Sequence, residues 1–222
     1  MTQRNTVSRR KWLGGVAAGA GVMALGGAAR AACTITPAQV NGPFFPMAIN
    51  DYDWDMTHVP GHRDRAEGEV VEIVGRVLDS TCKPLRGAIL DIWQANAGGR
   101  YLHPRDPSPV PLDPNFEGYA RLYTAADGAY RLRTIIPGAY PVGPDWVRPP
   151  HIHFKVHPAM SPSITTQMYF AGHELNQKDG LYLHTPEAAR PLITVAFDGT
   201  TADGVPVGTF DLHVEPGPEL PI

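Results

Sequence analysis

The sequence has only two cysteines, Cys33 and Cys82, among its 222 residues. A chain so poor in cysteine is not a disulfide-dense scaffold, and it is long enough to bury a core without one. Acidic residues are absent from the first 31 positions, which hold five basic ones. The other 191 residues therefore contain 14 basic and 22 acidic side chains, a net charge of −8. This charge repels phosphate backbones and anionic membrane surfaces, so nucleic-acid binding is not expected.

The N-terminal segment also lacks a long, strongly apolar run. Arg9 and Arg10 precede a weakly apolar stretch from 13 to 29, six of whose residues are glycine, and a small-x-small pattern follows. This resembles a twin-arginine signal peptide. It predicts a leader over 1–31, a mature domain over 32–222, and export to the periplasm or outside the cell. The alternative is a membrane anchor, but a spanning helix needs about 20 apolar residues, so no stable anchor is expected.

Export would place the two cysteines in an oxidising compartment, where they could pair. Cys33 lies just after the expected cleavage point and Cys82 lies in a predicted turn. A bond between them would tie the start of the mature chain to the folded domain. The alternative is that they are two unrelated buried thiols.

Long helices are disfavoured, because glycine and proline number 23 each and recur along the chain. They show no three-residue period, which excludes collagen. Alternating apolar residues between turn signals instead predict an all-β fold, a single β-sandwich domain of about eight short strands with long active-site loops. The expected strands are 69–79, 86–95, 118–124, 129–135, 151–157, 165–170, 192–197 and 207–214.

Three local features accompany these strands. Ala126-Asp127-Gly128 has the chemistry of a tight hairpin turn, which predicts that 118–124 and 129–135 pair with each other. The segments 102–117, with five prolines, and 171–185 read as long irregular loops of the kind that form lids or binding walls. A single helical turn is expected over 186–190.

His151 and His153 lie two residues apart in a strand pattern, so they share one face. Two imidazoles at this spacing can converge on one metal ion. Taken alone, the pattern is more typical of the wet face of an amphipathic strand than of a metal site. No carboxylate or cysteine accompanies the pair at the spacing that a zinc site or a facial-triad ferrous site would need.

Further motifs give the histidines a context. They are TP at 36–37, GPFF at 42–45, DIWQAN at 91–96, GRY at 99–101, LDPNF at 112–116, TIIPGAYP at 134–141, RPPHIHF at 148–154 and TQMYF at 166–170. In this order, over roughly residues 34–175, the chain resembles the intradiol ring-cleavage dioxygenases, in particular the protocatechuate dioxygenase branch. The resemblance implies an enzyme that cleaves a catechol between its hydroxyls with dioxygen and yields a cis,cis-muconate-type product.

The same resemblance implies a non-haem ferric ion, Fe(3+), held by Tyr101, Tyr140, His151 and His153. Phenolates are hard anionic donors, and a phenol ionises readily at neutral pH only with a strong cation on its oxygen. Tyr140 is the phenolate expected to leave the metal and to take a proton from the arriving catechol.

Two further residues match the family pattern. Arg148 matches the arginine that stabilises negative charge on the ring, and Gln167 matches a residue that lines the pocket. Val142 departs from the pattern, because protocatechuate enzymes tend to have tryptophan there. This leaves the ring substituent of the substrate open.

Two other functions remain possible on the sequence alone. One is a secreted, non-catalytic sandwich that kept the fold as a binding module. The other is a ferrous extradiol enzyme, which would need a carboxylate beside the histidines. The expected partners of the enzyme are a catechol and dioxygen, and a homo-oligomer is possible.

Overall fold

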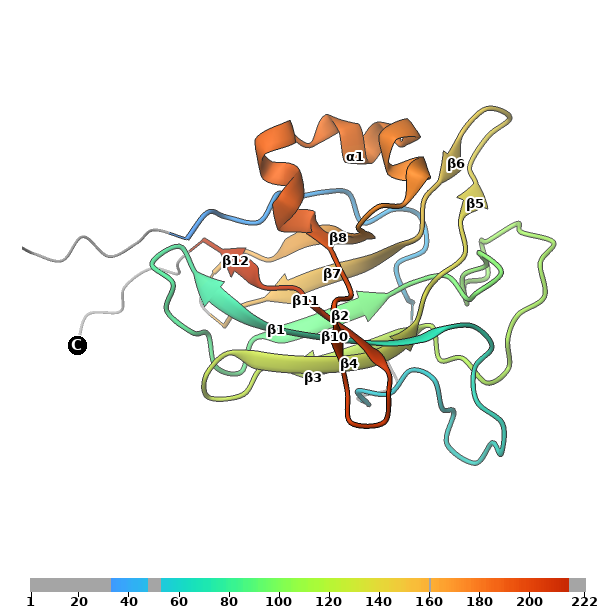
Figure 1. Ribbon diagram of the computed structural model, residues 1–222, viewed down its shortest axis with the longest axis horizontal. Coiled ribbons are helices and arrows are strands. Elements are labelled where there is room, and N and C mark those ends of the chain that lie inside the picture. The colour runs from blue at the N-terminus through green and yellow to red at the C-terminus, as the bar shows by residue number, and fades with distance from the viewer. Residues whose placement is uncertain (1–32, 48–52, 160, 216–222) are drawn as a thin grey trace, which may run out of the picture. The chain divides into compact units, whose positions relative to one another are not determined.

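This computed structural model describes residues 33–47, 53–159 and 161–215. Their main strands, in which apolar side chains alternate with others, form two β-sheets (Figure 1). The first sheet is centred on β1 (Val70–Asp79), which pairs antiparallel with β4 (Ala129–Ile135). On its other side β1 runs parallel to β11 (Pro206–Thr209) and β12 (Leu212–Val214). The short β10 (Gly199–Thr200) extends this sheet beyond β11.

The second sheet carries most of the motifs that the sequence singled out. Its strand order is β3 (Tyr119–Tyr123), β2 (Ile89–Trp93), β7 (His151–His157), β8 (Ile164–Phe170) and β9 (Thr194–Val195). All neighbours are antiparallel except β8 and β9. A separate two-stranded ribbon joins β5 (Tyr140–Pro141) to β6 (Val147–Arg148).

The core lies between the two sheets. Ile152, Phe154 and Val156 of β7 are fully buried there and pack in one cluster with residues of β1, β4 and β12. Burying a side chain of this size contributes about 1.5–3 kcal/mol. Because the apolar residues of β7 point inward, the alternate residues are directed to the outer face of the sheet. The predicted all-β sandwich is confirmed.

The hairpin predicted at Ala126-Asp127-Gly128 is wrong, although the turn exists. Gly128 has a φ of +76°, and its N–H donates to the carbonyl of Ala125. The strands on either side belong to different sheets, since β3 pairs with β2 and β4 pairs with β1. The turn is therefore a corner between the layers. The turn residues specify the local bend but not whether the two flanking strands pair, which here is set by their pairing with β1 and β2.

A helical segment covers the outer face of the second sheet, above β8 in Figure 1. It comprises the 3-10 helices η1 (Glu174–Lys178) and η2 (Glu187–Ile193) with the short helix α1 (Gly180–His184) between them. The prediction of irregular chain over 171–185 is thus wrong. The turn expected over 186–190 exists but extends to Ile193, which shortens the strand predicted over 192–197 to β9. The strand predicted over 207–214 is split into β11 and β12. Among the described residues, no helix has the length and hydropathy of a membrane span.

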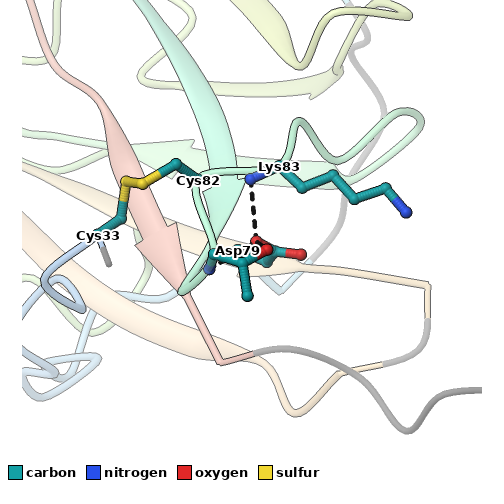
Figure 2. The surroundings of a disulfide bond; sticks show 5 residues. Cys33, Asp79, Cys82 and Lys83 are labelled. Carbon is teal, nitrogen blue, oxygen red and sulfur yellow. Dashed lines mark hydrogen bonds between the residues drawn. A yellow bond between two sulfur atoms is a disulfide. The ribbon is translucent and has the colours of Figure 1, made fainter. Parts of the chain in front are cut away.

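Residues 33–46, which we call the N-terminal strap, run from β12 of the first sheet to β8 of the second (blue in Figure 1). The strap is held by backbone hydrogen bonds, from Thr36 to the carbonyl of His213 at 3.0 Å and from Gln39 to that of Thr165 at 2.7 Å. A disulfide joins Cys33, at its start, to Cys82, with the Cα atoms 5.3 Å apart (Figure 2).

The Cys82 turn is itself held in place. The side chain of Asp79 accepts hydrogen bonds from the N–H groups of Thr81 and Lys83, at 2.8 and 2.9 Å (Figure 2). The disulfide therefore fixes the strap to a braced turn at the end of β1.

Replacing both cysteines with serine is expected to lower the free energy of unfolding by up to about 4 kcal/mol, the chain-entropy value for closing a loop of 49 residues. The loss should be smaller to the extent that the hydrogen bonds keep the strap docked. Urea unfolding of the exported protein measures it. An unchanged midpoint would show that the bond does not constrain the chain.

Candidate active site

The two histidines of β7 lie on the outer face of the second sheet, and both are buried there. His151 is opposite Tyr169 of β8, and His153 is opposite Gln167 on one side and Trp93 on the other. Only 1% of His151 and 3% of His153 are exposed. The wet-face interpretation of the pair is therefore wrong, because other parts of the chain cover this end of the strand.

The orientation of His151 is fixed by its backbone. Its Nδ1 lies 2.7 Å from the carbonyl oxygen of Pro149. A carbonyl only accepts, so Nδ1 carries the proton and Nε2 keeps a free lone pair. That lone pair faces the hydroxyls of Tyr101 and Tyr140, at 3.3 and 3.4 Å. A histidine held in this way is typical of a metal ligand.

Glycines bring the two tyrosines together. Tyr101 follows a turn that contains Gly99, whose φ is +85°. A Cβ on Gly99 would lie 2.6 Å from the carbonyl oxygen of Ala139, and one on Gly138 would lie 2.5 Å from that of Ala97. Any side chain at either position would force the two turns apart. Their contact sets the separation of Tyr101 and Tyr140.

Three donor atoms form a nearly equilateral triangle. The hydroxyls of Tyr101 and Tyr140 are 3.5 Å apart, and each lies 3.3–3.4 Å from Nε2 of His151. These separations are long for hydrogen bonds that involve a hydroxyl. A single point lies about 2 Å from all three atoms, close to the bond length of nitrogen and oxygen ligands to metals, about 2.0–2.2 Å for zinc. The triangle has the dimensions of a metal coordination shell.

His153 completes the donor set beside the triangle. Its ring centroid lies 5.0 Å from that of His151, and it stacks on Trp93 at 4.7 Å. Its Nδ1 is buried with no hydrogen-bond partner among the described residues. Two imidazoles and two phenols are donors that suit iron, and all four sequence-predicted ligands meet here.

Burial sets the protonation states of these groups. It lowers the pKa of His151 to about 3 and lowers the pKa of His153 well below its usual value. Both imidazoles are therefore neutral at neutral pH, which is the form that binds metals. Burial also raises the pKa of the Tyr101 and Tyr140 hydroxyls. The two phenols would ionise only with a cation close to their oxygens.

Arg148 lies beside the donors in a tightly held network. It is 5% exposed, and its Nε forms an ion pair of 3.0 Å with Asp179, which is fully buried. Its Nη2 donates to Gln167 Oε1 at 2.7 Å and to the Tyr169 hydroxyl at 3.2 Å. Burial disfavours the charged guanidinium, but the neighbouring tyrosine oxygens and Asp179 outweigh it and raise the pKa of Arg148.

Gln167 lies behind this arginine. It has no exposed surface, and its amide donates to the carbonyl of Val40 in the strap at 3.3 Å. It thus links the strap to Arg148.

A cavity of about 580 Å³ opens next to this site. Tyr140, His153 and Arg148 form its polar end, while the strap, prolines of the 102–117 loop and Val142 form its walls. The 102–117 loop, predicted to form a lid or binding wall, lines this cavity through its residues 106–109. A larger cavity, of about 880 Å³, touches Tyr101 but not Tyr140, His151, His153 or Arg148, so the smaller one is the candidate substrate site.

Sequence reasoning missed Asp179 and Trp146, which lie beside Arg148 at this site. Asp179, the ion-pair partner of Arg148, also accepts from the indole N–H of Trp146 at 3.0 Å and caps α1 through the N–H of Tyr182. Asp179 before Gly180 is a recognisable helix-cap signal. Nothing in that local signal points to an arginine 31 positions away.

The sequence of this chain is similar to those of known dioxygenases. A family model described as Dioxygenase matches residues 40–206. The protocatechuate 3,4-dioxygenase beta chain of Burkholderia cepacia is 44% identical over 169 residues, 74% of this chain and 72% of that protein. The chlorocatechol 1,2-dioxygenase of Pseudomonas putida is 31% identical over 210 residues, 85% of this chain and 71% of that protein.

A solved dioxygenase structure has a similar fold. The dioxygenase domain of a dioxygenase carbohydrate-binding protein fusion from Streptomyces sp. SirexAA-E has a TM-score of 0.62 and 31% identity, covering 82% of this chain and 99% of that one. The region that the family model matches contains all four donor residues and Arg148.

Proposed function

This chain belongs to the intradiol ring-cleavage dioxygenase family, and on that premise we propose that it binds ferric iron through Tyr101, Tyr140, His151 and His153. With that iron it cleaves a catechol between its two hydroxyls, using dioxygen. The relatives reported above are all named dioxygenases, which supports catalysis over a non-catalytic binding module.

One observation carries the proposal, the triangle of donor atoms with edges of 3.3–3.5 Å. A ferrous extradiol site would instead need a carboxylate beside the histidines. In the part of the chain that the structure describes, no three His, Cys, Asp or Glu side chains gather as such a site requires.

Ferric iron would supply the Lewis acidity that draws electron density from the bound catechol. Residues of the protein would accept the catechol proton and stabilise the negative charge on the ring. Tyr140 is the half-buried phenol that lines the cavity, so it is the one placed to receive a catechol proton. Arg148 presents a fixed positive charge to the same cavity, where negative charge develops on the ring.

The test is spectroscopic and chemical. Iron-loaded protein should be red to burgundy from phenolate-to-iron charge transfer, and it should consume dioxygen in proportion to catechol, forming a cis,cis-muconate. A protein that stays colourless and inactive after anaerobic iron loading and reoxidation would contradict the proposal. A yellow semialdehyde product would also contradict it, because it indicates extradiol cleavage.

We further propose that residues 1–31 direct export by the twin-arginine route. They lie outside the described residues, so their sequence alone supports this. Since that route carries folded proteins, iron should be loaded before export.

The name of the Burkholderia relative, a beta chain, supports a multi-chain assembly for that protein, and an oligomer of this chain is part of the proposal.

Changing Arg9 and Arg10 to lysine is expected to leave enzyme in the cytoplasm that contains iron and is active, but lacks the disulfide. Cell fractionation with iron analysis and thiol titration measures this. Exported wild-type protein should show no free thiol on denaturation. Cytoplasmic enzyme without iron would contradict the order of loading and export, and two free thiols in the exported form would contradict the cysteine pairing.

A further inference from the structure

The walls of the 580 Å³ cavity differ sharply from its metal-side end. Away from Tyr140, His153 and Arg148, the lining is mostly apolar and includes Val40, Phe44, Pro141, Val142, Trp146 and Leu181. Sites that bury drug-sized ligands occupy about 300–1,000 Å³. The cavity is therefore larger than a single catechol ring requires, and the extra space is apolar.

Charge in this cavity is unfavourable for an anionic substituent. Of the described residues that line it, Arg148 is the one Lys or Arg, and it lies at the metal-side end with Tyr140 and His153, where the catechol oxygens would bind. The lining also includes Asp106, whose two carboxylate oxygens accept from the N–H groups of Tyr101 and Ser108. Asp106 thus holds a negative charge at the wall. A ring carboxylate would lose water there without gaining a cation.

Two apolar residues lie at the rim of the cavity. Val142 and Trp146, on the turn between β5 and β6, line the cavity and are also 46% and 37% exposed. Arg105, in the 102–117 loop, donates from its guanidinium to the carbonyl of Pro43 in the strap and does not line the cavity.

Resting on the proposed function, we infer that the natural substrates are uncharged catechols with an apolar ring substituent, and that the cavity selects against carboxylated catechols such as protocatechuate. Val142 and Trp146 are the residues that set this preference.

The experiment compares 4-ethylcatechol, catechol and protocatechuate on the iron-loaded, full-length protein at physiological salt. The ratio kcat/KM is measured by oxygen uptake, and Kd by anaerobic calorimetry. We expect kcat/KM to be at least about 10-fold higher for 4-ethylcatechol than for protocatechuate. The ethyl group gains apolar contact, worth about 10-fold or more per methylene in an apolar pocket, whereas the carboxylate loses water without gaining a cation. The Kd values should follow the same order.

Paired variants make the test specific. Val142→Arg places a cation at the rim and should raise kcat/KM for protocatechuate about 10-fold while lowering that for 4-ethylcatechol. Val147→Arg is the matched control. Val147 is 41% exposed in the same ribbon but does not line the cavity. Successive residues of a strand point to opposite faces, so an arginine beside the cavity-lining Arg148 should point away from the cavity and leave the ratio nearly unchanged.

The outcomes separate this inference from the proposed function. Protocatechuate turned over as well as 4-ethylcatechol, or an equal effect of both arginine variants, would overturn the inference and leave intradiol cleavage intact. A coloured protein that binds and cleaves only the uncharged catechols would support both. A protein that cleaves none of the three would overturn both.

Discussion

Tyr101→Phe is expected to give a folded protein that has lost most of its iron and most of its visible colour. The change removes one of the three donor atoms in the triangle and half of the phenolate charge that would neutralise a ferric ion. The ring can stay in place, because it packs against Phe44 at 4.9 Å and Tyr140 at 5.5 Å. Iron analysis and the visible spectrum measure the loss.

His153→Ala should lose iron outright and with it all activity. Tyr119→Phe is the control for both changes, because Tyr119 belongs to the same small cluster as Tyr101 but directs its hydroxyl to Asp91, at 2.6 Å. This control should keep iron and colour. Full iron content and colour in both Tyr101→Phe and His153→Ala would remove these residues from the metal site.

Local patterns in the sequence predicted the strands well where burial follows a simple alternation. The strand 151–157 was predicted with its exact bounds, and its inward and outward faces are as expected. The pairing of strands could not be read in the same way. The turn at Gly128 is present, yet β3 and β4 pair with strands that lie far from it in the sequence.

In the candidate site, too, motifs identified individual residues but not the contacts that bring them together. The four donor residues were found because family motifs mark them, and their convergence depends on the contact between the Gly99 and Gly138 turns, which no periodicity reveals. Asp179 was missed because its local signal is that of a helix cap. Its pairing with Arg148 joins α1 to β6, and only the tertiary structure brings them together.

Arg148→Ala is expected to keep iron and colour but to lower turnover by about 10²–10³-fold, the usual effect of deleting one oriented electrostatic group. The Arg148 side chain contacts Asp179, Gln167 and Tyr169 rather than the four donor residues, so the metal site should survive its removal. Arg148→Lys should restore only part of the rate. A lysine cannot reproduce the guanidinium contacts to Asp179, Gln167 and Tyr169 together.

Deleting the arginine also leaves Asp179 buried without its partner, and breaking a buried pair typically costs about 3–5 kcal/mol of stability. Catalytic and structural effects must therefore be separated. Arg121→Ala is the matched control, since Arg121 pairs with the buried Asp91 at 2.6 Å in the second sheet but does not line the substrate cavity.

Both alanine variants should unfold at lower urea concentration, and only Arg148→Ala should lose turnover at saturating substrate. Asp179→Asn, which keeps a side chain able to cap α1, should lower turnover less than Arg148→Ala, because the guanidinium remains but loses its fixed orientation. If Arg148→Ala turned over catechol at the wild-type rate with its iron intact, the arginine would have no part in the chemistry and its network would serve stability alone.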